Sequence, residues 1–230
     1  MRDDMTISVI IPVLHEAENI NWLIDHLRGL PGGRSVEIIV IDGAPEKDTL
    51  RSIRRGGIKK LRSETGRGIQ MNTGARSARG DILLFLHADT FLPVNGLELI
   101  RRTMADPGIS GGAFKIRLDR IHPVLGALIF IHDLRGIITR APYGDQAIFL
   151  RREVFRKLGG YRDYRLFEDV DLMVRMRKGR YRIKLLSENV ISSGRRFERD
   201  GPFRRLARNL LVIFLYHIGI HPDRLVRLYR

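Results

Sequence analysis

The sequence predicts an α/β fold in which a doubly wound, mostly parallel sheet is flanked by helices and followed by a helical C-terminal segment. Two continuous β-branched runs, residues 7–14 and 36–42, are typical of strands that are buried on both faces. Between them, apolar residues of the segment 15–30 recur at helical spacing, and a Pro-Gly-Gly turn follows. These three observations indicate a βαβ unit.

The same alternation continues to about residue 108. We expect a helix from Asp48, a strand at 58–63, a helix across 68–78, a strand at 81–89 and a helix across 94–105. The pattern then loosens into the segments 110–118, 146–152 and 182–191, an apolar stretch at 121–139 and a helix around 170–176, with a strand expected just after Gln146. No repeat or low-complexity linker divides the chain, so residues 1–230 are predicted to form one domain.

Composition narrows the functional class. A chain of 230 residues that is 43% hydrophobic can bury a large core, and the absence of cysteine excludes disulfides and thiolate metal sites. The N-terminus lacks the features of a signal peptide, so we expect a cytoplasmic protein. Residues 151–230 carry 21 basic and 9 acidic residues within a formal net charge of +15. Nucleic acid is not the expected partner, because the arginines are scattered through amphipathic helices without a known binding motif.

Polar residues follow three of the expected strands where each strand ends. His15 and Glu16 follow the first strand, Asp42 ends the second, and His87 and Asp89 end a later one. Open parallel sheets bind ligands outside the carboxyl ends of their strands. Any one of these residues alone is more typical of a turn or a helix cap, but their shared placement indicates a binding site.

The chain resembles the family 2 glycosyltransferases, which have the GT-A fold. SVIIPVLHEAENI is similar to the opening strand and nucleotide loop of that family, VIDGAPEKDT to its aspartate turn, HAD to its metal-binding Asp-x-Asp, and FEDVDLMVRM to its catalytic-base motif. The order of FLHADT, YGDQAIF and FEDVDL is closest to a small bacterial branch. The resemblance implies transfer of a sugar from a nucleotide-diphosphate donor to an acceptor hydroxyl, with inversion at the anomeric carbon.

The resemblance also assigns parts of the chain. Residues 1–108 would form the nucleotide-sugar-binding half, 109–200 the acceptor and catalytic half, and 201–230 the basic and apolar C-terminal helices. The residues expected to contact the nucleotide sugar are Pro12, Val13, Leu14, Glu16, Asp42, Arg67 and His87.

Asp89 is the expected metal ligand. A divalent cation, Mn²⁺ or Mg²⁺, can neutralise the diphosphate leaving group, and both ions favour hard oxygen ligands. His87 occupies the position of the first aspartate of Asp-x-Asp, and imidazole binds Mg²⁺ poorly, so we expect His87 to contact the donor instead.

Asp169 is the predicted base that removes the proton of the acceptor hydroxyl, by resemblance to the family's acidic motif. Glu168 and Asp171 are the second acidic candidates. Asp171 lies two residues from Asp169 and should point to another face of a helix, so only one of them can readily face the site. Asp145 and Gln146 precede an expected strand and could bond acceptor or sugar hydroxyls.

The C-terminal segment 203–220 admits two interpretations. Its apolar run is too short to cross a bilayer, but arginines beside apolar residues suit an interfacial helix on an anionic membrane, which a lipid-linked acceptor would favour. A helix that packs on the sheet explains the same residues.

Two other classes of function remain open from the residues. A sugar-phosphate nucleotidyltransferase would share the sheet, but it should carry a Gly-rich loop with a lysine near the N-terminus, and this chain has none there. A non-catalytic nucleotide- or lipid-binding module would not need the acidic residues of FEDVDL.

Overall fold

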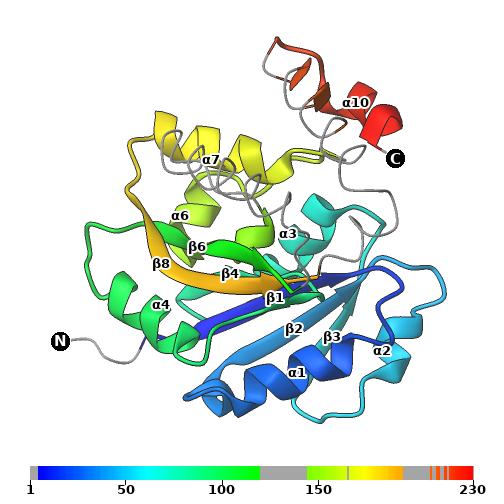
Figure 1. Cartoon of the computed structure of the whole chain (residues 1–230), viewed down its shortest axis with the longest axis vertical. Coiled ribbons are helices and arrows are strands. Elements are labelled where there is room, and N and C mark those ends of the chain that lie inside the picture. The colour runs from blue at the N-terminus through cyan, green and yellow to red at the C-terminus, as the bar shows by residue number, and fades with distance from the viewer. Residues whose placement is uncertain are drawn as a thin grey trace.

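The computed structural model describes residues 5–119, 144–164 and 166–193, and, nearer the C-terminus, residues 208, 211–212, 215–216 and 218–229. Its centre is an eight-stranded sheet with the strand order β3-β2-β1-β4-β7-β6-β8-β5 (Figure 1). The strands are β1 Ile7–Val13, β2 Glu37–Asp42, β3 Ile58–Arg62, β4 Ile82–Phe85, β5 Thr90–Phe91, β6 Gly111–Leu118, β7 Phe149–Arg151 and β8 Ile183–Ser192.

Helices cover both faces of this sheet. They are α1 Ile20–Gly29, α2 Asp48–Ser52, α3 Arg67–Ser77, α4 Gly96–Met104, α6 Arg152–Lys157 and α7 Glu168–Lys178. Helix α10 Pro222–Tyr229 packs away from the sheet, and short 3-10 turns lie at Gly33–Ser35 and Gly144–Gln146. In Figure 1, α1 and α4 lie on one side of the strands, and α3, α6 and α7 lie on the other.

The strand pairing confirms the predicted doubly wound sheet and adds a mixed region. β1 pairs in parallel with β2 and β4, and β2 pairs in parallel with β3. β7 is inserted between β4 and β6 and is antiparallel to both, whereas β6 and β8 are parallel. The carboxyl ends of β1, β2 and β4 therefore meet at one edge, where the sequence predicts a ligand site.

Alternating side chains of the strands build two separate cores. Val9, Ile11 and Val13 of β1 pack in the core that includes the apolar faces of α1 and α4. Ile10 points the other way, into the core formed with α3, α6 and α7. Because successive strand side chains point to opposite faces, a continuous apolar run fills both layers.

The structure corrects details of the predicted elements. The strand predicted at 81–89 ends at Phe85, so His87 and Asp89 lie in the turn that leads to β5. Helix α6 was not predicted. The apolar stretch 121–139 lies outside the described residues. Within the part of the chain that the structure describes, no helix is both long and apolar enough to cross a membrane.

The described C-terminal residues pack on the start of α7. Val212 and Leu225 are buried in one cluster with Leu166, Phe167 and Val170. The described part of the C-terminal segment therefore matches the packing interpretation, although its partner is a helix and not the sheet. Residues 203–207 of the predicted interfacial helix lie outside the described residues.

Gly112 of β6 tests the tightness of the mixed region. A Cβ at this position would lie 2.4 Å from the Lys184 carbonyl oxygen and 2.4 Å from Cζ of the Phe149 ring. We expect Gly112→Ala to lower the free energy of unfolding by about 1–3 kcal/mol, the usual cost of overpacking. Gly29→Ala is the control, because a Cβ there has no neighbour within 4 Å. Equal urea midpoints for the two variants would contradict the packing described.

Candidate active site at the carboxyl edge of the sheet

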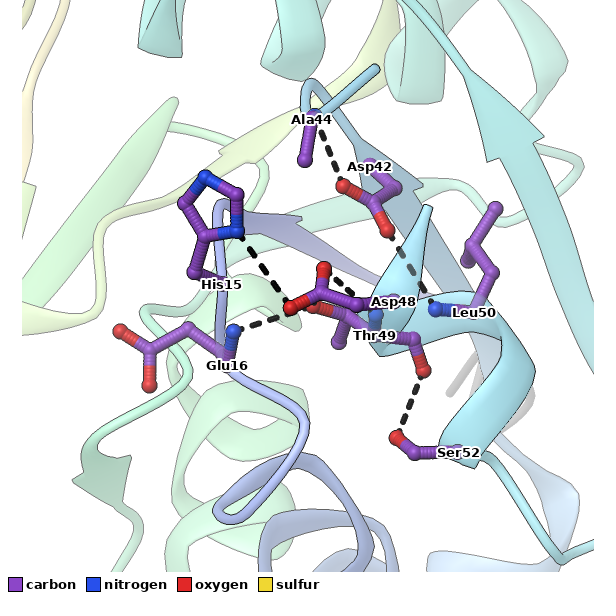
Figure 2. A network of polar contacts seen from close by, with 8 residues as sticks. All are labelled: His15, Glu16, Asp42, Ala44, Asp48, Thr49, Leu50 and Ser52. Carbon is purple, nitrogen blue, oxygen red and sulfur yellow. Dashed lines mark hydrogen bonds and ion pairs between the residues drawn. The ribbon is translucent and has the colours of Figure 1, made fainter. Parts of the chain in front are cut away.

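Asp42 holds the loop that follows β2. It is 1% exposed, and its Oδ1 accepts a hydrogen bond from the Ala44 amide at 2.9 Å while Oδ2 accepts one from the Leu50 amide at 3.3 Å (Figure 2). An aspartate that bonds the amide two residues ahead forms an Asx turn, which replaces backbone partners within a loop. Asp42 therefore shapes the predicted nucleotide loop from inside, and its contact with a base stays a prediction.

The loop after β1 is tied to α2 by two contacts. His15 Nδ1 lies 3.3 Å from Asp48 Oδ2, and the Glu16 amide donates to Thr49 Oγ1 at 3.0 Å (Figure 2). His15 has a φ of 56°, a left-handed conformation that is uncommon outside glycine. Such backbone conformations persist where their surroundings impose them and are frequent at functional sites.

The remaining residues predicted to line the nucleotide differ in exposure. Pro12 and Val13 are buried within β1, and their contact with a nucleotide stays a prediction. Leu14 is 44% exposed. Glu16 is half-buried, and its Oε2 accepts a hydrogen bond from the side-chain Nδ2 of Asn19.

Gln70 of α3 is a site residue that the sequence analysis missed. Its buried amide nitrogen donates to the Val13 carbonyl at 2.7 Å and to the Ile41 carbonyl at 2.9 Å. One side chain thus bridges the ends of β1 and β2 beneath the loops that follow them. A polar residue on the helix face shared with Met71 and Gly74 was the available signal.

The 144–146 turn and the start of α7 meet the HAD turn around Gly144. The Gly144 amide donates to Asp169 Oδ2, and a Cβ on Gly144 would lie 3.1 Å from that oxygen and 3.5 Å from His87 Nε2. The Asp169 carboxylate and the His87 imidazole therefore both lie beside the backbone of Gly144. Three segments distant in sequence come together here.

Asp145 stands among like charges. Burial, the charge of Asp169 and, to a smaller extent, that of Asp89 raise its pKa to about 6, and the Arg67 guanidinium opposes them. Asp145 Oδ1 is buried and has no hydrogen-bond partner among the described residues. The predicted site residues Asp89, Asp145 and Asp169 therefore share one region, in which Arg67 only partly offsets their negative charge.

The two remaining acidic candidates have different roles. Glu168 is 4% exposed, lies 3.9 Å from the Arg67 guanidinium, and has its pKa raised mainly by burial. Asp171 points elsewhere: Oδ2 lies 2.7 Å from Arg175 Nε and Oδ1 lies 3.7 Å from Arg162 Nε. The predicted divergence of Asp169 and Asp171 is confirmed, and Asp171 is the member used in ion pairs.

Helix α3 joins this acidic group to the nucleotide loops. Asn72 donates to the Tyr161 carbonyl at 2.8 Å and accepts from the Tyr161 amide at 2.9 Å. A Cβ at Gly68 would lie 2.8 Å from the Arg162 carbonyl oxygen, so the first turn of α3 touches the segment before α7. Arg67 at the start of α3 thereby reaches Glu168.

Gln146 lies below the site and not at its surface. It is 1% exposed, and its amide nitrogen donates to the Phe114 carbonyl at 3.1 Å. The structure gives Gln146 a supporting contact with the Phe114 carbonyl, and its contact with acceptor or sugar hydroxyls stays a prediction. Among the described residues, no group of three or more His, Asp or Glu side chains is arranged to hold a metal ion by itself.

Known proteins resemble this chain in sequence and in fold. The model of the family described as Glycosyl transferase family 2 matches residues 8–159. Glucosyl-3-phosphoglycerate synthase from Mycolicibacterium paratuberculosis (strain ATCC BAA-968 / K-10) is 31% identical over 97 residues, which is 38% of this chain and 30% of that protein. The chain thus matches under a third of the length of that relative.

Two solved structures share the fold. A mannosyltransferase from Pyrobaculum calidifontis in complex with GDP-Man and Mn²⁺ superposes with a TM-score of 0.73 at 20% identity, covering 97% of this chain and 68% of its own. Glucosyl-3-phosphoglycerate synthase from Mycobacterium tuberculosis with Mn²⁺, UDP and glucosyl-3-phosphoglycerate gives 0.67 at 19% identity, covering 95% of this chain and 82% of its own.

Asp145 should make stability depend on pH. Its pKa is about 6 in the folded chain against an ordinary 3.8, so the folded state holds a proton that the unfolded chain has released. Ionisation of Asp145 therefore does not reduce the free energy of unfolding at low pH, and it reduces that free energy progressively between about pH 4 and 6. We expect Asp145→Asn to raise the free energy of unfolding by about 1–3 kcal/mol at pH 7 and to give no gain at about pH 4.

Urea unfolding at several pH values, with divalent cations chelated, measures this difference. Asp163→Asn removes an exposed carboxylate from the segment before α7 and controls for the change in net charge. A gain that is the same at every pH would contradict the assignment.

Proposed function

Because this chain belongs to glycosyl transferase family 2, we propose that it is an inverting enzyme that moves a sugar from a nucleotide-diphosphate donor to an acceptor hydroxyl. The observation that carries the proposal is the meeting of Asp169, Asp145 and His87 around the backbone of Gly144. These groups come from the HAD turn, the 144–146 turn and α7, at the edge where the strands of the nucleotide loops end.

Asp169 is the proposed base. Its carboxylate is held by the amides of Gly144 and Val170, and Asp171, the alternative, is occupied by Arg175 and Arg162. A base must lie within hydrogen-bond reach of the proton that it takes, so a carboxylate in a defined orientation suits the role. The acceptor hydroxyl would attack as the donor bond breaks, giving inversion in one displacement.

Donor binding is assigned to the loops after β1 and β2 and to α3. Leu14 and Glu16 are accessible beside the bridged strand ends, and the half-exposed Arg67 guanidinium is placed to meet a phosphate. The GDP-Man and UDP present in the two structural relatives support a nucleotide-diphosphate donor.

A divalent cation, Mn²⁺ or Mg²⁺, fits this site. The raised pKa of Asp145 and its unpartnered buried oxygen indicate a deficit of positive charge among the described residues. Asp89 would hold the ion with an anionic oxygen, and the donor's phosphates would supply further ligands, since the described residues contain no complete ligand set. When bound, the cation would neutralise charge on the diphosphate leaving group. Mn²⁺ in both relatives supports this assignment.

The proposal leaves the acceptor as an unidentified hydroxyl compound. Val212 of segment 203–220 is buried in one cluster with the start of α7, which favours the packing interpretation of that segment over the membrane interpretation. Membrane binding is therefore not part of the proposed function.

Asp169→Asn tests the base. We expect turnover to fall by about 100-fold or more while nucleoside-diphosphate binding stays near wild type, because the amide keeps the shape but cannot accept the proton. Asp171→Asn is the matched variant: it should lower stability by leaving Arg175 without its ion pair, with a smaller effect on turnover in folded protein. Wild-type turnover in Asp169→Asn would make Asp171 the next candidate and reject the assignment.

Asp89→Ala and His87→Ala separate the metal ligand from the donor contact. Calorimetric titrations with nucleoside diphosphate, with and without Mn²⁺, should show that Asp89→Ala loses the metal-dependent part of binding. His87→Ala should weaken binding and retain the metal response, because a neutral nitrogen is the weaker ligand for a hard cation. Circular dichroism checks that both variants fold. Metal-dependent binding by Asp89→Ala at the wild-type level would show that the site is misplaced.

A further inference from the structure

The acidic start of α7 depends on an unusual backbone conformation. Phe167, the residue before the helix, has a φ of 65° and a ψ of 21°, and it makes no side-chain capping bond. A bulky residue with a left-handed backbone is a genuine outlier, which persists only where surrounding contacts impose it. The direction in which the chain enters α7, and so the orientation of Asp169 two residues later, follows from this residue.

Residues of the C-terminal segment pack against Phe167, beside Leu166 and Val170. The Phe167 and Tyr216 rings lie 4.7 Å apart at an interplanar angle of 37°. Val212 and Leu225 close the same cluster, and Tyr164 and His221 make a second ring contact at 5.4 Å. Burial and the charges of Asp171, Tyr164 and Asp169 raise the pKa of Tyr216, which is consistent with a ring close to the acidic groups.

We propose that Tyr216 is a positioning residue for the proposed base: its ring clamps Phe167 in the left-handed conformation that starts α7 and thereby orients the Asp169 carboxylate toward Gly144. The catalytic consequence rests on the function proposed above, whereas the effect on α7 does not. Tyr216 acts through Phe167 and needs no contact with the substrate. A displacement of a catalytic group by about 1 Å can cost about 100-fold in rate, so a clamp outside the site can control turnover.

The proposed contact between Tyr216 and Phe167 predicts a local change in amide protection at the first turn of α7. The Asp171 amide donates to the Phe167 carbonyl at 3.0 Å, so loss of the Phe167 conformation should release this hydrogen bond first. Hydrogen exchange measured by mass spectrometry on peptides across 166–174 reads this directly and requires no substrate.

Three full-length variants test the proposal. Tyr216→Ala removes the ring, Tyr216→Phe keeps the ring without the hydroxyl, and Ile218→Ala removes a 59% exposed side chain from the same segment as the control. We expect Tyr216→Ala to accelerate exchange at 168–171 and to lower kcat by about 10- to 100-fold, with nucleoside-diphosphate binding within about twofold of wild type. Tyr216→Phe should restore both properties, and Ile218→Ala should match wild type.

Several outcomes would overturn the proposal. Wild-type exchange across 168–171 in folded Tyr216→Ala would show that the ring does not hold the helix start. An equal loss of kcat in Tyr216→Phe would assign the effect to the hydroxyl, and a parallel loss of nucleotide binding would indicate general destabilisation. If Tyr216→Ala does not fold, Tyr216→Leu, which keeps apolar volume without an aromatic face, must show the same faster exchange. Wild-type protein that transfers no sugar would reject the proposed function and leave the exchange result valid.

Discussion

Repulsion among carboxylates at the carboxyl edge of the sheet is the constraint around which the rest of the site is built. Asp145 has like-charged neighbours in Asp169 and Asp89, and Arg67 is the cation that opposes them in the described structure. Such groups separate unless their backbones prevent it, because charges in a poorly solvated region interact strongly. Each carboxylate is accordingly carried on a tightly anchored segment, and the arrangement favours a bound cation.

Helix α3 is the element that supplies this anchoring to both halves. Gln70 bridges the ends of two strands below the nucleotide loops, and Asn72 forms a reciprocal pair with the backbone of Tyr161. Arg67 then places its charge beside Glu168. Three side chains within two helical turns thus connect the strand ends of the first half with the entry to α7, so that the two halves of the proposed site share one support.

The sequence predicted those features that depend on local pattern. Continuous β-branched runs indicated β1 and β2, and the two-residue spacing of Asp169 and Asp171 correctly indicated different directions on a helix. Features set by distant contacts were missed: the antiparallel insertion of β7, helix α6, and the burial of Gln70 and Gln146 under carbonyls of other segments. The sequence does not show whether a glutamine side chain faces water or bonds to a strand end, because the tertiary fold determines its surroundings.

The insertion of β7 between β4 and β6 has a consequence for how the chain acquires its structure. β1, β2 and β3 join through connections within one stretch of sequence, whereas Ile82 of β4 pairs with Arg151 of β7 across the segment that holds β5, α4 and β6. Closing a long loop carries an entropic cost that is recovered only when the final contacts form. The first half is therefore expected to fold early and to act as the folding nucleus. The edge that carries Asp145 and Asp169 is expected to form late. A partly folded chain would then lack the assembled acidic site.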